Sequence, residues 1–142
     1  MSDVYIQTRI LSPSKLLLER KTTHVQVPGI LGYLGFLPGH VDLVTQLVVG
    51  TLTLETKGES PAFFFVTGGY VEYHDHVLHI LVDFVERPED IDSTRAKQAE
   101  ERALERLQGA KEGPVDVRRA LASLERAKAR QKLLQMSTGK HQ

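Results

Sequence analysis

Three histidines stand close together in the sequence, and their spacing is a first sign of possible chemistry. His74, His76 and His79 form an H-x-H-x-x-H pattern, and imidazole nitrogens are common zinc ligands. On one strand His74 and His76 would face the same side. The pattern crosses an expected turn at His74-Asp75, however, and no cysteine or carboxylate cluster completes a ligand set. We therefore expect no metal, and a small β-barrel metalloenzyme that uses this cluster stays as the alternative.

A fourth histidine, His40, follows Pro38-Gly39 and is a candidate general base. No nucleophile or paired acid stands beside it, so we expect a structural or interface histidine instead. The chain has no cysteine, which excludes disulfides, thiolate zinc sites and cysteine nucleophiles. It also has no Walker A motif, so any nucleotide site must use another design.

The sequence that would position these residues shows two patterns, one typical of strands and, further along the chain, one typical of helices. Up to about Glu86 the sequence is strand-like, because Val4, Ile6, Thr8 and Ile10 alternate with polar or aromatic residues. Short apolar runs follow this first strand, separated by turn signals that contain Gly, Pro, Ser or Asp. Such punctuation predicts an antiparallel β-sandwich or flattened barrel. The expected strands lie near residues 24–27, 43–49, 52–54, 62–66, 70–73 and 77–85.

Residues 32–40, written GYLGFLPGH, predict a glycine-rich loop. The loop lacks the serine, threonine or lysine of a phosphate cradle. It must turn sharply, and we expect it to hold Tyr33, Leu34, Phe36 and Leu37 outward. Apolar side chains on an exposed loop are typical of a docking edge.

After Arg87-Pro88 the sequence becomes helical. Asp92 is a suitable N-cap for a first helix, and Gly113-Pro114 separates it from a second helix over about residues 115–135. Two helices with a short connection predict an antiparallel hairpin. We place the domain boundary between residues 87 and 88. The first helix would bury Ala96, Ala99, Ala103 and Leu107, and the second an apolar stripe of Val117, Leu121, Leu124, Gln131 and Leu134 with Ala120 and Ala127 beside it.

Alanine faces make this predicted hairpin a marginal unit. A buried methyl contributes far less than a leucine side chain at about 25 cal/mol per Å² of buried apolar surface. Such a hairpin can leave its resting place at low cost. An alanine-rich hairpin that never moves is the alternative.

The charge is balanced overall but polarised along the chain. Residues 1–86 carry five basic and nine acidic side chains, residues 87–113 six and seven, and residues 114–142 seven and two. The basic second helix could suggest nucleic-acid binding, but no aromatic residue follows Phe84 to stack on bases. We therefore expect no nucleic-acid partner. No apolar targeting run or run of eighteen apolar residues occurs, which predicts a soluble, cytoplasmic protein.

Several motifs, in order over essentially the whole chain, give a resemblance. They are Gly35, Leu37-Pro38-Gly39-His40, Gly50, Gly68-Gly69 and Ile91-Asp92-x-x-Arg95-Ala96. With them the chain resembles the epsilon subunit of F-type ATP synthase. The resemblance implies a non-catalytic rotor subunit in the central stalk, with a flattened β-sandwich and a two-helix hairpin.

The resemblance also implies partners. The sandwich would join the gamma subunit to the foot of the stalk and rest on the c-ring, which would be its only association with the membrane. The protein would then lie at the cytoplasmic face of the bacterial inner membrane. In this family a glutamate commonly follows Gly32, and here the residue is Tyr33. The docking residues implied are Tyr33, Leu34, Phe36, Leu37 and His40.

Some bacterial members of the family bind ATP between the folded-down helices without hydrolysing it. Arg126 and Arg130 are four residues apart and share a helix face, where two guanidiniums can grip a polyphosphate. Glu86 and Asp92 could accept hydrogen bonds from the adenine amino group. Surface ion pairs are the alternative role for all of them. No cofactor would be obligatory, with ATP as a regulatory ligand. The matching positions are Glu86, Ile91, Asp92, Arg95, Ala96, Arg102, Arg126 and Arg130.

Finally, the resemblance implies an inhibitory state. In this family the hairpin opens, and its second helix rises along gamma into the head of alpha and beta subunits, where it meets acidic residues of beta. The tail, residues 114–142, carries the net positive charge that such a contact requires. The side chains implied to contact beta are Arg118, Arg119, Arg126, Lys128, Arg130 and Lys132.

Overall fold

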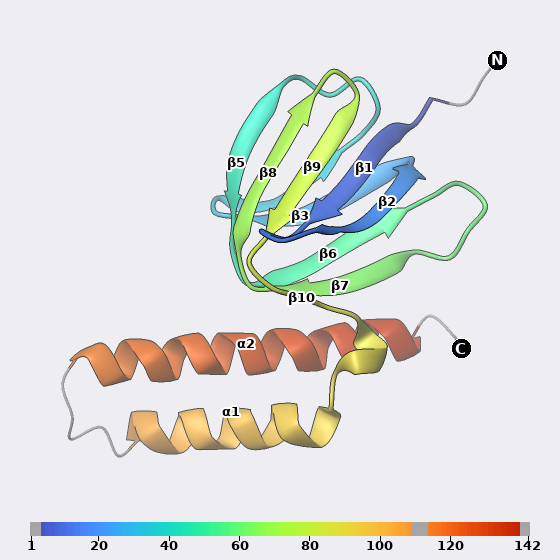
Figure 1. Cartoon of the computed structure of the whole chain (residues 1–142). Coiled ribbons are helices and arrows are strands. Elements are labelled where there is room, and N and C mark those ends of the chain that lie inside the picture. Colours follow the sequence, from blue (N-terminus) through green and yellow to red (C-terminus); the bar gives the residue numbers. More distant parts are fainter. Residues whose placement is uncertain (1–3, 109–113, 140–142) are drawn as a thin grey trace. The chain divides into compact units, whose positions relative to one another are not determined.

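The computed structural model describes residues 4–108 and 114–139, with side chains at 4–108 and 117–136. The chain divides into two compact units, Met1–Val85 and Glu86–Gln142. The first unit contains strands and the second contains helices, so the predicted fold class is confirmed (Figure 1).

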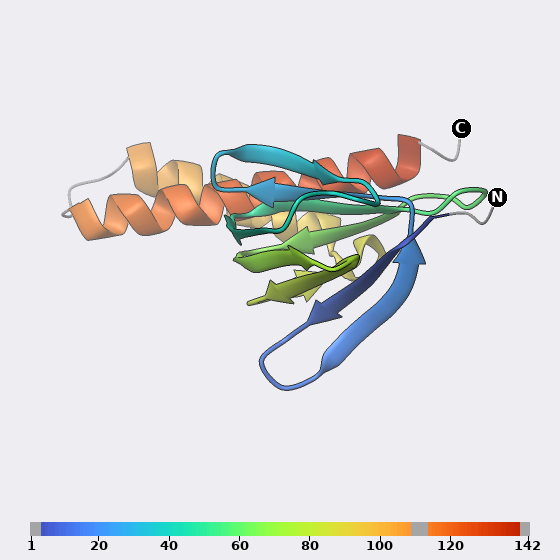
Figure 2. The ribbon, with the colours of Figure 1, turned by 90° about the horizontal axis from the view of Figure 1, so that it is seen from above.

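The strands form one continuous, strongly curved sheet, and its last strand ends at Glu86, the first residue of the second unit. Its order is β10-β7-β6-β3-β5-β8-β9-β1-β2, with β4 paired to β3 as a side hairpin. β1 and β9 run parallel, whereas the pairs β1–β2, β3–β4, β3–β5, β3–β6, β5–β8, β6–β7 and β8–β9 are antiparallel. Figure 2 shows the sheet curving between the β3–β4 and β1–β2 hairpins. The strands are β1 Ile6–Leu11, β2 Leu16–Thr22, β3 His24–Gly29, β4 Gly32–Phe36, β5 Leu43–Leu47, β6 Gly50–Glu55, β7 Ala62–Val66, β8 Gly69–His74, β9 Val77–Val82 and β10 Val85–Glu86.

The core of the sandwich follows the alternation in the sequence. Ile6, Thr8 and Ile10 are at most 1% exposed, whereas Gln7 and Arg9 between them are partly exposed. The hydroxyls of Thr8 and Thr22 lie 2.8 Å apart and satisfy each other inside this core. The alternation predicted for the first strand is therefore confirmed from Ile6 to Ile10, whereas Val4 lies before the strand and is 61% exposed.

Two strands were missed by sequence reasoning. In β2, three leucines precede charged residues without regular alternation, and the strand lies at the edge of the sheet. In β4, glycines hide the pattern, but the strand pairs with β3 from Val25↔Phe36 to Gly29↔Gly32. Residues 32–36 are therefore a strand, and only the stretch after Phe36 is a loop.

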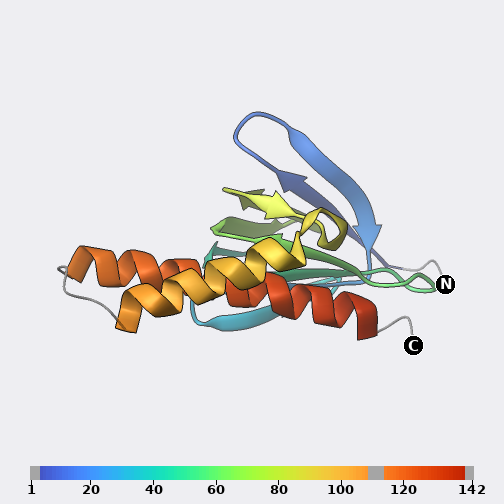
Figure 3. The same ribbon diagram turned by 90° about the horizontal axis from the view of Figure 1, so that it is seen from below.

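The second unit is a helical hairpin. A 3-10 turn, Pro88–Asp90, precedes α1 (Ser93–Gln108) and α2 (Pro114–Gly139). The two helices run in opposite directions and cross against each other (Figure 3). Asp92 is the N-cap of α1 as predicted, because its Oδ1 accepts a hydrogen bond from the N–H of Arg95 at 3.1 Å.

The buried faces of the hairpin are lined by alanine. Ala96 and Ala103 are the buried positions of α1, and Ala120 and Ala127 on α2 are each 1% exposed. Both pairs are seven residues apart, so each stays on one side of its helix.

The predicted stripe of α2 is partly wrong. Leu121 is 47% exposed, and Leu133, outside the predicted stripe, is fully buried. The small alanines select the buried side because they let helix backbones approach closely. Leu121, one residue beyond Ala120, is thereby turned about 100° away.

Candidate functional site

An ion pair joins α2 to Glu86, which ends β10 and is the first residue of the second unit. The Nε–H of Arg130 on α2 donates to Oε1 of Glu86 at 2.9 Å, across 44 positions of sequence. The Arg130 and Glu86 side chains are only 25% and 20% exposed. This pair joins two residues of the predicted ATP-binding set.

A second contact stands beside this ion pair. Gln131 on α2 donates from its side-chain amide to Oε2 of Glu100 on α1. Arg126, one turn before Arg130, donates from Nη2 to the Ser123 hydroxyl at 3.1 Å. Arg126 and Arg130 therefore lie on the same side of α2, as their spacing predicts.

The remaining residues of the predicted ATP set lie at the start and on the exposed side of α1. Ile91 is 9% exposed, and its N–H donates to the Pro88 carbonyl at 3.1 Å. Asp92 is exposed but already accepts from the backbone as an N-cap. Ala96 lies in the hairpin interface, whereas Arg95 and Arg102 are exposed on α1. The set thus combines three exposed or half-buried guanidiniums with the Glu86–Arg130 pair.

The predicted docking edge is partly confirmed as an exposed apolar surface and partly wrong. Tyr33 and Leu37 are 52% and 59% exposed. Leu34 is half-buried and packs against the core. The expectation that Phe36 points outward is wrong, because Phe36 is fully buried and its ring stacks on Tyr73 at 5.8 Å. Strand geometry explains this result, since alternate residues of β4 face opposite sides.

The exposed tyrosine is held rigidly. The Tyr33 hydroxyl accepts a hydrogen bond from the backbone N–H of Thr51 at 3.1 Å. A side chain on Gly50 would bring its Cβ within 2.9 Å of that hydroxyl and 2.6 Å of Pro28 Cβ. Glycine at position 50 therefore makes room for the Tyr33 anchor.

The loop after β4 is fixed by aromatic residues. The His40 ring lies 4.8 Å from the Phe36 ring centroid and 5.5 Å from that of Tyr73. Its Nδ1 lies 2.7 Å from the Val41 carbonyl, and the N–H of Gly39 donates to the Tyr73 hydroxyl at 3.1 Å. His40 thus has a structural place in the loop, with Leu37 exposed beside it.

Sequence reasoning missed two residues of this exposed surface. Ile30 and Leu31, at the turn between β3 and β4, are 53% and 99% exposed. A signal was present, because residues 22–41 contain no Asp, Glu, Lys or Arg in a chain that is 25% charged. We call Ile30, Leu31, Tyr33 and Leu37 the apolar edge.

The histidine pattern spans a hairpin turn. His74 ends β8, and Asp75 and His76 occupy the turn with φ values of 50° and 64°. Such left-handed pairs are typical of tight β-hairpins. The prediction that the pattern crosses a turn is therefore confirmed, and His74 and His76 do not share one strand face.

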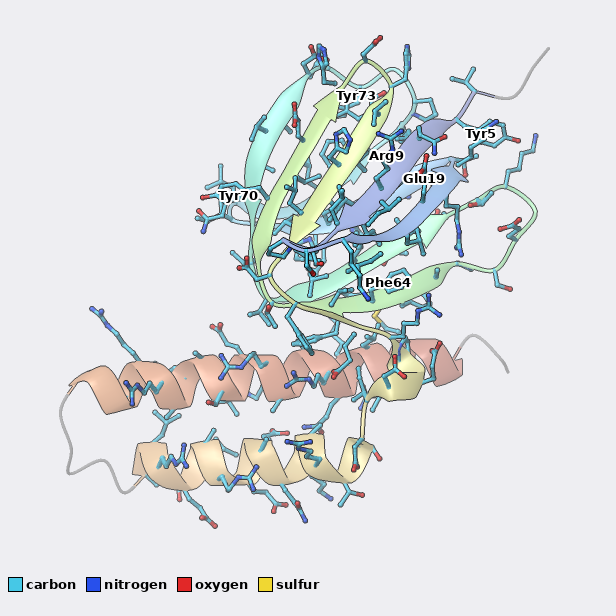
Figure 4. All side chains as sticks on the ribbon, in the orientation of Figure 1. Tyr5, Arg9, Glu19, Phe64, Tyr70 and Tyr73 are labelled. Carbon is cyan, nitrogen blue, oxygen red and sulfur yellow. The ribbon has the colours of Figure 1, made fainter. Side chains whose placement is uncertain are left out.

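Each of the outer histidines has its own neighbour. His74 Nδ1 lies 2.8 Å from Asp42 Oδ2, and this hydrogen bond and charge raise the pKa of His74 above 6.5. His79 Nε2 lies 3.4 Å from Arg9 Nη1. Arg9 Nε in turn lies 3.4 Å from Glu19 Oε1, and Figure 4 labels these two residues on neighbouring strands. A guanidinium beside His79 opposes a metal cation there. Among the described residues no three His, Cys, Asp or Glu side chains are grouped to hold a metal.

The positive charge predicted for the tail lies on α2. Arg118, Arg119, Lys128 and Lys132 are exposed, and Arg126 and Arg130 are half-buried. In the described part of the chain, neither helix has the length and apolar character needed to cross a membrane.

Comparisons with known proteins agree over both units. Residues 5–88 match the family "ATP synthase, Delta/Epsilon chain, beta-sandwich domain", and residues 89–135 match "ATP synthase, Delta/Epsilon chain, long alpha-helix domain". The ATP synthase epsilon chain of Nitratidesulfovibrio vulgaris (strain DP4) is 38% identical over 128 residues, 90% of this chain and 94% of the relative. That of Moorella thermoacetica is 40% identical over 127 residues, 89% of this chain and 94% of the relative.

Solved structures share the fold. A chain of the Euglena gracilis mitochondrial ATP synthase (OSCP/F1/c-ring, rotational state 1) matches with a TM-score of 0.81 at 20% identity, covering 96% of this chain and 84% of that one. A chain of the Tetrahymena thermophila mitochondrial ATP synthase central stalk/c-ring matches with a TM-score of 0.65 at 18% identity, covering 90% and 95%. The family matches over residues 5–135 and the epsilon chains at 38% and 40% identity show that this chain belongs to the delta/epsilon chain family of ATP synthases.

Proposed function

We propose that this chain is the epsilon subunit of an ATP synthase, a non-catalytic part of its central stalk. The observation that carries the proposal is the match of both units, in order, to the two domains of the family. Relatives named ATP synthase epsilon chain align over 94% of their own length, so the likeness extends to the whole subunit.

The sandwich, in this proposal, docks onto the gamma subunit and the c-ring through the apolar edge. Leu31 is 99% exposed and Leu37 59% exposed, which is costly unless a partner covers them. Tyr33 is oriented by its hydrogen bond to Thr51 and stays half-exposed, so it can anchor an interface at little entropic cost. The protein would then lie on the cytoplasmic face of a bacterial inner membrane, attached through the c-ring.

Co-purification tests the docking. The full chain is expected to bind its organism's gamma subunit and assemble with the c-ring. Leu31→Asp and Leu37→Asp place an unpaired charge in the interface and should weaken assembly, whereas Lys57→Asp, on an exposed turn, should not. Assembly that is unchanged in both leucine variants would show that the apolar edge is not the interface.

The helical unit, in this proposal, binds ATP as a regulatory ligand. Arg126 and Arg130 would hold the phosphates with Arg95 and Arg102 nearby, while Glu86 and Asp92 would serve the adenine and Ile91 and Ala96 would form the floor. The support is that Arg126 and Arg130, four residues apart on α2, share a side of that helix and that Glu86 lies next to Arg130, so these members of the set are close together. Arg126→Ala and Arg130→Ala should each weaken ATP binding by about 1–3 kcal/mol, the range for charge-assisted hydrogen bonds.

Calorimetry on the full chain measures this affinity. Arg119→Ala is the matched control, because Arg119 is exposed on α2 outside the set. No heat of binding at millimolar ATP would refute the site.

In the third part of the proposal, α2 is an inhibitor of ATP hydrolysis. When the hairpin opens, its basic side chains Arg118, Arg119, Arg126, Lys128, Arg130 and Lys132 would meet acidic groups of the beta subunit within the alpha/beta head. The net positive charge of residues 114–142, seven basic against two acidic, supports this direction of attraction. Two of these arginines also belong to the ATP set, so ATP binding and inhibition would exclude each other.

A further inference from the structure

The Glu86–Arg130 ion pair joins two residues that the proposed ATP site would use at opposite ends of the ligand. Arg130 would hold a phosphate, and Glu86 would accept from the adenine amino group. In the structure the two side chains contact each other directly at 2.9 Å.

This contact cannot persist unchanged when ATP binds. A carboxylate 2.9 Å from Arg130 would repel a polyphosphate arriving at the same guanidinium. The pair is also shielded, with side chains 25% and 20% exposed, so the repulsion is less screened than on an open surface. Glu86 must therefore release Arg130 as the phosphates approach.

The neighbouring contact does not conflict with ATP. Gln131 donates to Glu100 on α1, and neither residue belongs to the proposed ATP set. The alanine faces of α1 and α2 are apolar. Exchange of the Glu86–Arg130 ion pair can thus occur while the Gln131–Glu100 contact and the alanine faces stay in place.

We propose that the Glu86–Arg130 ion pair is a latch that holds the hairpin closed without ATP, and that ATP binds by replacing it. The inference rests on the ATP site proposed above and adds how that site is regulated. The hairpin is closed both without and with ATP. The ion pair holds it in the first case, and contacts with ATP hold it in the second. Opening then requires that ATP is absent and that the latch breaks.

The latch is tested with the full chain by measuring the separation of the two helices. The chain has no cysteine, so Glu101→Cys on α1 and Glu125→Cys on α2, both at exposed positions, provide a unique spin-label pair. Double electron–electron resonance then gives the closed and open fractions. Glu86→Gln removes the charge but keeps an oxygen that can accept from an adenine amino group.

Without ATP, Glu86→Gln should raise the ratio of open to closed hairpin about fivefold, which is less than the loss of a whole charge-assisted hydrogen bond because the amide oxygen can still accept from Arg130. The matched control is Glu89→Gln, which removes a charge from an exposed site three residues away and should leave the ratio unchanged. At saturating ATP, wild type and Glu86→Gln should be equally closed, because the latch is then absent from both. The exchange Glu86→Arg with Arg130→Glu should close the ATP-free hairpin again but abolish its response to ATP.

The possible results distinguish a failure of the latch proposal from a failure of the ATP-site proposal. If Glu86→Gln is as closed as wild type without ATP, the latch is wrong, even if ATP binds. If Glu86→Gln opens the hairpin but the wild type does not bind ATP, the ion pair does hold the hairpin closed. The same result would overturn the ATP site and the proposal that ATP replaces the ion pair. If Glu86→Gln opens the hairpin and ATP then fails to close it, Glu86 is needed in the bound state and the exchange is wrong.

Discussion

Replacing two neighbouring residues, Phe36 and Leu37, should have opposite effects on stability and on assembly. Phe36 is fully buried, with its ring stacked on Tyr73 at 5.8 Å and the His40 ring at 4.8 Å. Phe36→Ala should therefore lower the free energy of unfolding by about 3–5 kcal/mol, the range for removing a core phenylalanine. Leu37 is 59% exposed, and Leu37→Ala should change stability by less than about 0.5 kcal/mol.

Urea denaturation followed by circular dichroism measures both variants. With a slope of about 2 kcal/mol per M for a domain of this size, Phe36→Ala should lower the midpoint of the sandwich transition by roughly 2 M. Leu37→Ala should unfold like the wild type but bind the gamma subunit or c-ring more weakly. Equal stability of the two variants would refute the division of this segment into a buried side and a docking side.

Three further perturbations test other parts of the structure. Gly69→Ala should destabilise the sandwich by about 3 kcal/mol or more, because φ at this residue is +128° and a Cβ would lie 1.9 Å from the Leu81 carbonyl oxygen; a soluble variant with unchanged thermal unfolding would contradict this. Asp92→Ala should cost the hairpin about 1 kcal/mol through loss of the N-cap, measured as reduced helicity on heating, whereas Asp92→Asn should restore it. The pKa of His74 should lie above 6.5 in a nuclear magnetic resonance titration and fall towards 6.5 in Asp42→Asn. Because folding raises this pKa, the stabilisation by the pair is fully present below 6.5 and is lost as the pH rises through the raised value; a pKa of His74 that is the same in both proteins would be evidence against the contact.

What the sequence predicted was mainly local. Alternation at Ile6 and Ile10 predicts a strand because side chains on a strand alternate between faces. Asp92 was predicted as an N-cap because capping depends on residues within one turn. The helical hairpin followed from alanine spacing and from the break at Gly113-Pro114.

What the sequence did not predict depends on distant pairing. β4 is a strand because β3 pairs with it, and its glycines show no apolar period of their own. Phe36 was expected outside because the segment was interpreted as a loop, where faces do not alternate. On α2, Leu121 belongs to a regular stripe of large apolar residues and was therefore expected to be buried. Instead Ala120 and Ala127 are buried, because the helices pack through their smallest residues.

The candidate site was predictable as a set of residues but not as a set of contacts. The motif around Ile91 and the arginines of α2 drew attention to Glu86 and Arg130. Their direct contact joins positions 44 residues apart and depends on the hairpin as a whole. The outer residues Ile30 and Leu31 were missed, although the uncharged stretch of residues 22–41 marked them.

The central claim is that this chain is a stalk subunit whose α2 helix inhibits hydrolysis. Its most direct test is the ATPase activity of F1 from the same organism, reconstituted with the full chain or with a chain that ends at residue 113, at low and at millimolar ATP. We predict that both chains assemble and that the shortened chain gives faster hydrolysis at low ATP, with a smaller difference at millimolar ATP. Neutralising Arg118, Arg119, Lys128 and Lys132 together should relieve part of the inhibition without changing ATP binding by the isolated chain. Equal hydrolysis rates with the full and shortened chains at low ATP, both assembled, would contradict the account.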